Sequence, residues 1–327
     1  MPIRIDRCAA RAMAPRFDEA LELVRNEFDS LDQDRQYRNT FARLLKPDPL
    51  QRVRMLGTDQ RDLFVPALRE LIPEVVPPGG HILDLGAGDG QTFALLADLV
   101  PAGATVSYEE PNAGYAADYG AFLETQDHLR PGLAMVAGFE EIDTIDPAPP
   151  PDGSVDLVLA LHILYFIGDL PAGLLRMARF LKPGGALCVV VAEETQAWSG
   201  RALRAFIDAG GDTGRNEGHL AAMAERKRLL GGVLMDVMAA GLPEASFALE
   251  TRLQPSRLYG HALSDLIALA NLAELSPVPG IGKFEAPCGL LRSDPEAVDL
   301  RIEDEGPRKG MWSVAQPQLL SILRRRG

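Results

Sequence analysis

The sequence predicts an α/β fold in which helices cover both faces of a mostly parallel sheet. Short apolar segments alternate with longer segments in which apolar residues recur every three or four positions. Continuous apolar strands are typical of a parallel sheet buried on both faces, and their alternation with helices is typical of a doubly wound fold with right-handed crossovers. The predicted strands are 81–85, 105–109, 134–137, 155–161 and 187–191, with a sixth at 247–253 and a seventh at 319–323.

Helical segments are predicted between the strands and on either side of them. Their apolar residues recur at three- and four-residue intervals, which places these residues on one side of a helix. Proline and glycine between 73 and 80 are predicted to end the third helix, and the Pro- and Gly-rich segment 276–309 is predicted to be irregular. The predicted helices are 17–28, 37–45, 62–72, 92–99, 113–123, 174–181, 200–208, 218–240 and 256–275.

The order of these segments predicts three parts of the chain. Residues 1–74 are expected to form an N-terminal helical cap segment, and residues 75–200 a Rossmann-like core that binds a nucleotide. Residues 201–327 are expected to supply further helical cap insertions and the last strands of the sheet. Because the helices after the fifth strand are longer than a minimal crossover needs, we expect them to cover the open edge of the sheet with the N-terminal helices.

Composition and charge exclude several classes of protein. The chain has 327 residues, 46% apolar and 24% charged residues, and a formal net charge of −13. A nucleic-acid partner is disfavoured, because phosphate binding depends on Lys and Arg. No run approaches the ~20 apolar residues that span a membrane, and the N-terminal residues lack the apolar region of a signal peptide. We therefore expect a cytoplasmic protein with a small-molecule substrate and no membrane partner, either a monomer or a homodimer. The three separated cysteines indicate neither a disulfide framework nor a metal site.

Three glycines follow the first predicted strand at the point where a ligand is expected. In an open parallel sheet, ligands bind at the carboxyl ends of the strands, and Gly86, Gly88 and Gly90 let the backbone turn tightly there. Glu109 and Glu110 end the next strand, where a carboxylate can accept hydrogen bonds from a ribose. The pattern therefore predicts a site for a nucleotide-like ligand.

The chemistry of the glycine loop separates two classes of nucleotide. Its spacing is G-x-G-x-G, whereas G-x-G-x-x-G is typical of a dinucleotide site. Asp84 precedes the first glycine by two positions and Asp89 lies within the loop. These carboxylates repel a pyrophosphate and attract a cation that carries an amino group and a sulfonium. A nicotinamide-dependent dehydrogenase is therefore disfavoured. The alternative role for Asp84 is to cap the turn.

Four motifs resemble those of class I S-adenosylmethionine-dependent methyltransferases. Residues 82–90 resemble the first motif, 110–112 the acidic ribose motif, 156–160 the fourth strand and 181–185 the turn before the fifth strand. The resemblance spans roughly residues 75–195 and implies a seven-stranded Rossmann-like methyltransferase sheet. It also implies S-adenosyl-L-methionine as cofactor and S-adenosyl-L-homocysteine as product. The implied cofactor-binding residues are Asp84, Gly86, Ala87, Gly88, Glu110, Glu140 near the adenine, and Leu161 with His162 beside it. Glu141 is the alternative to Glu140.

Two further segments are similar to the histamine N-methyltransferase-like group of small-molecule methyltransferases. They are 161–172 and 37–45, and Trp198 matches that group in type and place. The resemblance implies an aromatic pocket whose rings enclose a small amine. Core packing is the alternative for Tyr165 and Phe166. The substrate-binding candidates are Tyr37, Phe41, Phe166, Trp198, Glu194 and His261.

Three positions depart from that group. His162 stands where the group carries Gln. Leu50 stands at the position where the group carries its substrate-binding Glu, with Asp48 close by. The C-terminal Asn of the group has no counterpart, and Gln316 or Gln318 is the nearest candidate. The predicted amine is therefore not identified with histamine.

We predict methyl transfer to a small molecule, with an amine nitrogen as the acceptor. His162 and Tyr165 are the catalytic candidates, because a histidine titrates near neutral pH and can act as a base or orient the acceptor. The alternatives for His162 are hydrogen bonding to the cofactor and capping the strand. The alternative functions are O- or S-methylation of a metabolite and S-adenosylmethionine binding without catalysis.

Overall fold

The chain folds into two compact units, each built from segments that are distant in sequence. The computed structural model describes residues 2–48, 55–211, 214–273, 275, 278 and 280–327. The sheet unit comprises Asp62–Val191, Arg228–Gln254 and Leu319–Gly327. The helix-rich unit comprises Met1–Arg61, Ala192–Lys227 and Pro255–Gln318.

Seven strands form the sheet unit in the order β4-β3-β2-β5-β6-β11-β7. The pairs β2–β3, β3–β4, β2–β5 and β5–β6 are all parallel. This order confirms the predicted doubly wound α/β fold with seven strands, because the chain moves outward from β2 in both directions. The strands are β2 (His81–Leu85), β3 (Thr105–Glu109), β4 (Arg130–Met135), β5 (Val155–Leu161), β6 (Leu181–Ala192), β7 (Phe247–Gln254) and β11 (Gln318–Arg325).

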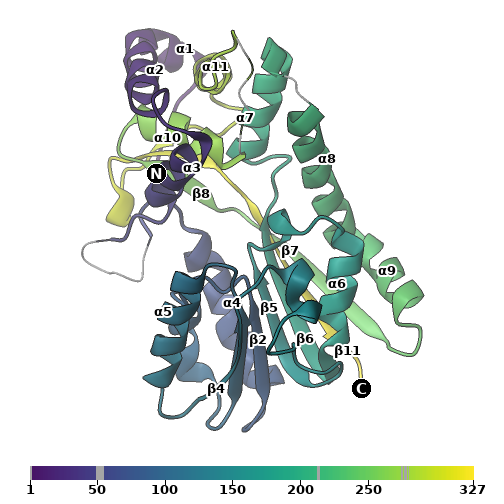
Figure 1. The fold of residues 1–327 in the computed structure, drawn as a ribbon. Helices are drawn as coiled ribbons and strands as arrows, with labels where there is room; N and C mark the ends of the chain where they lie inside the picture. Colours follow the sequence, from purple (N-terminus) through teal and green to yellow (C-terminus); the bar gives the residue numbers. More distant parts are fainter. Residues whose placement is uncertain (1, 49–54, 212–213, 274, 276–277, 279) are drawn as a thin grey trace. The chain divides into compact units, whose positions relative to one another are not determined.

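Apolar residues bury both faces of this sheet. In β2, Leu83 and Leu85 belong to one hydrophobic cluster and Ile82 belongs to another, as the alternation of side chains along a strand requires. Different helices contribute apolar residues to the two clusters; Figure 1 labels these helices on the ribbon. They are α6 (Leu170–Arg179) and α9 (Leu234–Gly241) in the first cluster, and α4 (Gln60–Val75) and α5 (Ala113–Glu124) in the second.

Several predicted element boundaries in the sheet unit are wrong. The strand predicted at 134–137 begins at Arg130, and the strand predicted at 187–191 already begins at Leu181. The helix α4 continues through Pro73 to Val75, because proline removes one backbone N–H without preventing the last turn. The segment predicted as the helix 92–99 forms two 3₁₀ turns, η1 (Phe93–Leu95) and η2 (Ala97–Leu99).

The helix-rich unit combines helices with a second, four-stranded sheet. The sheet has the order β1-β9-β10-β8, and its pairs are antiparallel. Its strands are β1 (Ile3–Arg4), β8 (Arg257–Gly260), β9 (Arg301–Ile302) and β10 (Trp312–Ala315). The helices are α1 (Arg7–Ala12), α2 (Ala14–Phe28), α3 (Gln33–Leu44), α7 (Trp198–Phe206), α8 (Gly214–Arg228), α10 (Leu263–Leu269) and α11 (Glu285–Ser293).

This second sheet is absent from the sequence-based expectations, and several predicted helices differ from the structure. The predicted helix 218–240 is interrupted between α8 and α9 at η6 (Leu229–Val233), where Gly232 has a φ of 140°. The predicted helix 256–275 is wrong at its start, where β8 forms, because a short apolar run does not distinguish strand from helix. Helices α10 and η7 (Ala270–Ala273) follow. The segment 276–309, predicted as irregular, contains α11, whose Pro287 lies in the first turn, where proline is tolerated.

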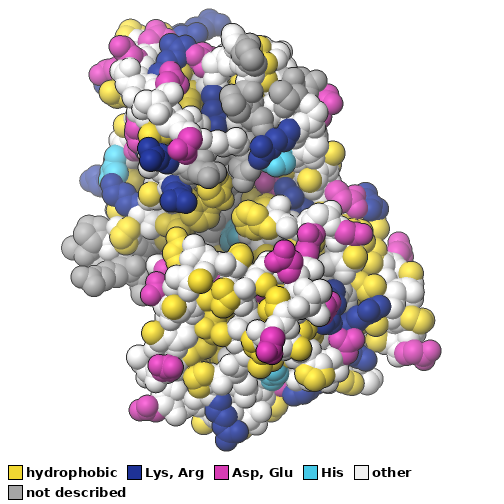
Figure 2. Space-filling model, in the orientation of Figure 1, with side chains coloured by type: hydrophobic (Ala, Val, Ile, Leu, Met, Phe, Trp, Pro, Cys, Tyr) yellow, Lys and Arg dark blue, Asp and Glu magenta, His cyan; other side chains and the backbone are white. Residues whose placement is uncertain are grey.

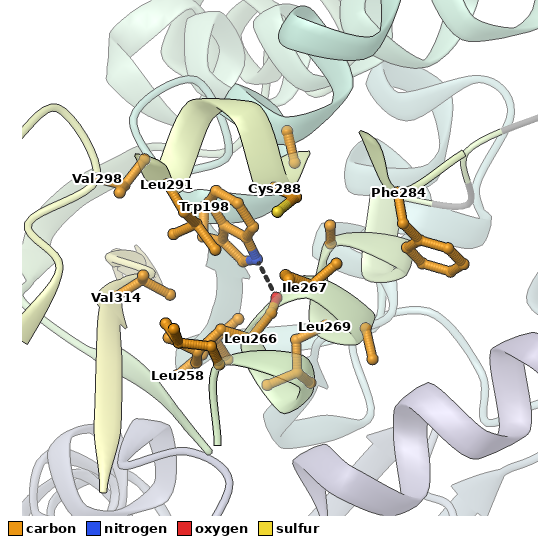
Figure 3. Close-up of a cluster of buried hydrophobic side chains, with 14 of the residues drawn as sticks. Trp198, Leu258, Leu266, Ile267, Leu269, Phe284, Cys288, Leu291, Val298 and Val314 are labelled. Carbon is orange, nitrogen blue, oxygen red and sulfur yellow. Dashed lines mark hydrogen bonds between the residues drawn. The ribbon is translucent and has the colours of Figure 1, made fainter. Parts of the chain in front are cut away.

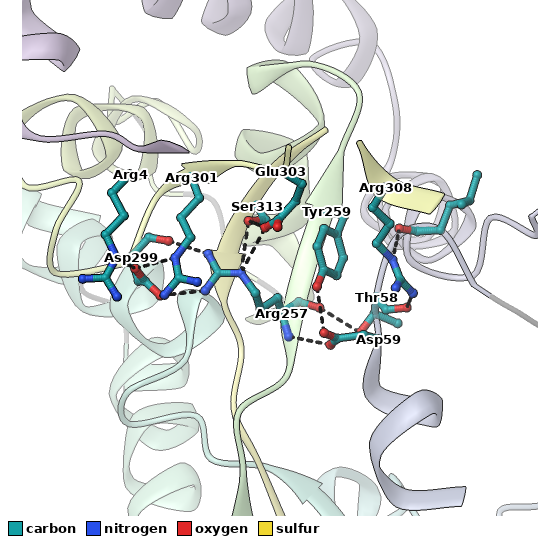
Figure 4. Close-up of polar contacts among 11 residues, drawn as sticks. Arg4, Thr58, Asp59, Arg257, Tyr259, Asp299, Arg301, Glu303, Arg308 and Ser313 are labelled. Carbon is teal, nitrogen blue, oxygen red and sulfur yellow. Dashed lines mark hydrogen bonds and ion pairs between the residues drawn. The ribbon is translucent and has the colours of Figure 1, made fainter. Parts of the chain in front are cut away.

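An ion-pair network joins the strands of the second sheet (Figure 4). Arg257 on β8 donates from Nη1 to Asp299 at 2.7 Å and from Nε to Ser313 of β10 at 3.1 Å. Arg301 on β9 donates from Nε to the other oxygen of Asp299 at 2.8 Å. The carboxylate of Asp299 therefore accepts hydrogen bonds from arginines of two strands. Burial alone would raise its pKa, but these hydrogen bonds outweigh burial and the pKa lies below its ordinary value.

The core of the helix-rich unit surrounds Trp198, the first residue of α7. Its side chain is fully buried, and its indole N–H donates to the backbone oxygen of Leu266 at 2.9 Å (Figure 3). Leu291 of α11 and Val314 of β10 belong to the same cluster. Trp198 therefore holds helices and the second sheet of this unit together, with its polar atom satisfied.

The surface combines charges of both signs. On the face drawn in Figure 2, acidic and basic side chains are interspersed. Within the part of the chain that the structure describes, no helix has the length and apolar character needed to cross a membrane.

Candidate active site

The glycine loop leaves the carboxyl end of β2 in a conformation that favours glycine. Gly86, Gly88 and Gly90 have φ angles of 62°, 59° and 78°, in the left-handed region. A Cβ on Gly90 would lie 2.5 Å from the ring of Tyr119, so the close approach of α5 also requires glycine there. The amides of this loop are outside regular secondary structure and must find other acceptors.

Two adjacent carboxylates at the end of β3 accept these amides. Glu109 is paired with Leu85 across the two strands, and its Oε2 accepts the N–H of Gly86 at 2.9 Å. Glu110 accepts the N–H of Gly88 on Oε2 at 2.9 Å and that of Asn112 on Oε1 at 2.8 Å. The structure therefore brings the predicted ribose carboxylate and the predicted glycine loop together.

Glu109 is the more deeply buried of the two carboxylates. It is 1% exposed, whereas Glu110 is 8% exposed. Burial raises the pKa of Glu109 to about 7; the Gly86 hydrogen bond opposes this rise, and the neighbouring charges of Glu110 and Asp84 add to it. An oxygen of Glu110 is thus better placed to reach a ligand.

Asp84, a predicted cofactor-binding residue, is bonded to a tyrosine. It is 4% exposed, and the hydroxyl of Tyr119 on α5 donates to its Oδ2 at 3.0 Å. Burial raises the pKa of Asp84 to about 7, against the effect of the Tyr119 bond. Sequence reasoning missed Tyr119, although Ala116, Tyr119 and Leu123 form an apolar stripe on α5 that indicates which side faces the sheet.

The end of β5 lies beside the glycine loop. Ala160 of β5 pairs with Leu85 of β2, and the side chain of Ile163 is 3.0 Å from the position of a Cβ on Gly86. Between them, Leu161 and His162 are half-buried. Ile163 was not among the predicted site residues, and it is the side chain that packs against the first glycine.

His162 has an unusual backbone conformation and contacts two aromatic rings. Its φ of 62° is in the left-handed region, and its N–H donates to the backbone oxygen of Val190 at 2.8 Å. Its Nδ1 is 3.1 Å from the hydroxyl of Tyr165, and the two rings are stacked. The ring of Phe64 on α4 meets the imidazole edge to face, with the ring centroids 6.1 Å apart. The two predicted catalytic residues are therefore in direct contact.

The other predicted residues of the sheet unit lie on its surface. Glu140, in the 3₁₀ turn η3 (Phe139–Thr144), is exposed and accepts the N–H of Gly168 at 2.8 Å. Phe166 is 65% exposed, and its ring meets that of Tyr165 edge to face. Exposure of Phe166 disfavours its alternative role in core packing, while Tyr165 is half-buried.

The remaining predicted substrate-binding residues lie in the helix-rich unit. Tyr37 and Phe41 are neighbours on α3, with ring centroids 5.4 Å apart, and His261 is exposed. Trp198 belongs to the core described above, and Glu194 is buried, with the Nε of Arg226 3.0 Å from its Oε2. The placements of Trp198 and Glu194 favour packing and ion pairing over a role on an open pocket wall. The role of these residues in substrate binding stays a prediction.

Apart from His162, the positions at which the sequence departs from the histamine N-methyltransferase-like group also lie in this unit. Asp48 is buried, and Leu50 lies outside the described residues. Gln316 donates from Nε2 to the hydroxyl of Ser199 at 2.9 Å, and Gln318 donates to the backbone oxygen of Gln60 at 3.1 Å. Both glutamines are buried and bond within the unit.

Comparison with known proteins gives one family. A family model described as a methyltransferase domain matches residues 58–230. The chain is 33% identical over 123 residues to the ubiquinone/menaquinone biosynthesis C-methyltransferase UbiE of Stenotrophomonas maltophilia (strain R551-3). The aligned region covers 37% of this chain and 46% of that protein. It is 30% identical over 148 residues to a trans-aconitate 2-methyltransferase of Methylobacterium nodulans, covering 45% of this chain and 50% of that protein.

The chain spans about half the length of these curated relatives. Among solved structures, the YcgJ protein of Bacillus subtilis aligns with a TM-score of 0.46 and 13% identity, over 80% of this chain and 99% of that one.

Replacing Asp84 by Asn tests whether burial raises the pKa of this carboxyl group. Because its folded pKa of about 7 lies above its ordinary value of 3.8, Asp84 stabilises the folded chain at low pH, and this contribution is lost as the pH rises toward 7. Asn keeps an oxygen that can accept the Tyr119 hydroxyl. We expect the stability of Asp84→Asn relative to the original protein to rise by on the order of 2 kcal/mol between pH ~5 and ~8, measured by urea unfolding.

The exposed Asp118, one residue before Tyr119 on α5, provides the control. Asp118→Asn should leave the difference from the original protein nearly constant over the same pH range. Equal pH dependence of the two variants would contradict the assignment to Asp84.

Proposed function

Because the chain belongs to the methyltransferase domain family, we propose that it transfers the methyl group of S-adenosylmethionine to a small molecule. The observation that carries this proposal is the arrangement of the glycine loop and the two carboxylates at the carboxyl ends of β2 and β3. Glu109 and Glu110 hold Gly86 and Gly88 at 2.9 Å each, next to the end of β5. The amine acceptor and the closer relation to the histamine N-methyltransferase-like group stay predictions from the sequence.

The charge of the site fits this cofactor. Asp84, Glu109 and Glu110 are three carboxylates at the start of the loop, and Asp89 lies within it, whereas residues 84–90 contain no Lys or Arg. Such a loop repels the pyrophosphate of a dinucleotide and favours a ligand with a sulfonium and an ammonium group. The proposed roles are the ribose for Glu110, the methionine part for Gly86 to Gly88, and the adenine side for Glu140.

Orientation is the main contribution that the protein has to make. When bound, S-adenosylmethionine supplies a methyl group that its sulfonium already activates toward in-line displacement. The loop and the end of β5 would hold the acceptor in line with the methyl group and keep water away. Orientation of this kind can lower the activation barrier by about 7–11 kcal/mol. His162 is the proposed base or orienting residue, with Tyr165 fixing its ring through Nδ1 at 3.1 Å.

The relatives bear on the acceptor only through their names. One is named as a C-methyltransferase of ubiquinone/menaquinone biosynthesis and the other as a trans-aconitate 2-methyltransferase. Neither name describes an amine. Carbon and carboxylate acceptors therefore belong beside amines, hydroxyls and thioethers among the classes to test.

A screen with methyl-labelled S-adenosylmethionine tests the function directly. We expect label to move to at least one class among amines, phenols, carboxylates, thioethers and activated carbon acids, and excess S-adenosylhomocysteine to suppress the transfer. Binding of the cofactor without transfer to any class would favour the non-catalytic alternative. Failure to bind either compound would contradict the proposal.

Replacing His162 by Asn tests the proposed catalytic role. Asn tolerates the left-handed backbone of this position and removes the imidazole. With an acceptor that must lose a proton, we expect kcat to fall about a hundredfold while affinity for S-adenosylhomocysteine changes much less. Tyr165→Phe is the matched control and should cost less, because it leaves the imidazole in place. An unchanged kcat for His162→Asn would assign His162 to capping the strand.

A further inference from the structure

Glu109 holds two successive amides at the start of the glycine loop. Its side-chain Oε2 accepts the N–H of Gly86, and its backbone oxygen accepts the N–H of Ala87, both at 2.9 Å. The parallel register between β2 and β3 fixes this contact, because Leu85 lies opposite Glu109 and Gly86 follows directly. The loop therefore begins from a residue that is anchored in the sheet.

The side chain of Glu109 is enclosed by the protein. It is 1% exposed, and the carboxylates that raise its pKa are Asp84 of β2 and the adjacent Glu110. A carboxylate buried beside two others raises the free energy of its charged form. Its presence is accounted for by the amide that it binds.

The neighbouring Glu110 is arranged differently. It is more exposed and divides its two oxygens between the amides of Gly88 and Asn112. The bonds of Glu109 to Gly86 and Ala87 use other atoms than the bonds of Glu110. A ribose hydroxyl that donates to Glu110 therefore requires no change in the two bonds of Glu109.

We propose that Glu109 is a positioning residue, which holds Gly86 in the cofactor-binding conformation by accepting its amide and does not itself touch the cofactor. This inference rests on the proposed function, since it assigns the loop to S-adenosylmethionine. For holding Gly86, the property that matters is an acceptor oxygen at this distance from the backbone, whether or not that oxygen carries a negative charge.

Three variants separate the acceptor from the charge. Glu109→Gln keeps an oxygen at the same distance from the backbone and removes the charge. Glu109→Asp keeps the charge but withdraws it by one methylene, and Glu109→Met removes the acceptor at similar length. We expect Gln to bind S-adenosylhomocysteine like the original protein, and Asp and Met each to bind about tenfold more weakly, the effect of one lost hydrogen bond. Calorimetric titration measures the affinities, and thermal unfolding shows that each variant is folded.

Amide exchange in the ligand-free protein tests the loop independently of the cofactor. With ¹⁵N-glycine labelling, the Gly86 amide should stay protected in Glu109→Gln and exchange about tenfold faster or more in Glu109→Asp and Glu109→Met. If the original protein binds no S-adenosylhomocysteine, the proposed function fails while the exchange still reports on Glu109. The proposal would be overturned if Glu109→Gln bound S-adenosylhomocysteine weakly while Glu109→Asp bound it normally. It would also be overturned if a variant lost protection of the Gly86 amide but kept its affinity for S-adenosylhomocysteine.

Discussion

The parallel pairing of β2 with β3 on one side and β5 on the other is the constraint on which the candidate site depends. Leu85 lies opposite Glu109 and opposite Ala160. Because all three strands end at one edge of the sheet, the glycine loop, the two carboxylates and the segment of His162 converge there without any contact specific to a ligand. A shift of one residue in this register would turn each of these side chains to the other face of the sheet.

The same edge combines a left-handed glycine backbone with buried carboxylates. Three glycines with positive φ leave loop amides that need acceptors, and Glu109 and Glu110 supply them. The cost is that carboxylates lie close together at low exposure, and the pKa values of Asp84 and Glu109 rise to about 7. A ligand that brings positive charge relieves this repulsion. The loop is therefore suited to a cationic ligand in its geometry and in its charge.

The sequence predicted the sheet and the loop well because both follow from local patterns. The strands 81–85, 105–109 and 155–161 have the predicted bounds, since buried strands are continuous apolar runs. The second sheet was not predicted, because strands as short as β9 carry too few residues for any period. Trp198 was assigned to a pocket from resemblance, whereas its full burial depends on α10 and α11, which no local pattern places next to it.

Direct titration of S-adenosylhomocysteine into the original protein and into Glu110→Ala tests the central proposal, that Glu110 at the end of β3 binds the ribose of S-adenosylmethionine. The account predicts saturable binding to the original protein, no comparable binding of NADH, and a Kd about tenfold to a hundredfold higher for Glu110→Ala, since a charge-assisted ribose contact is lost. Equal affinity of the two proteins, or binding of NADH in place of S-adenosylhomocysteine, would contradict it.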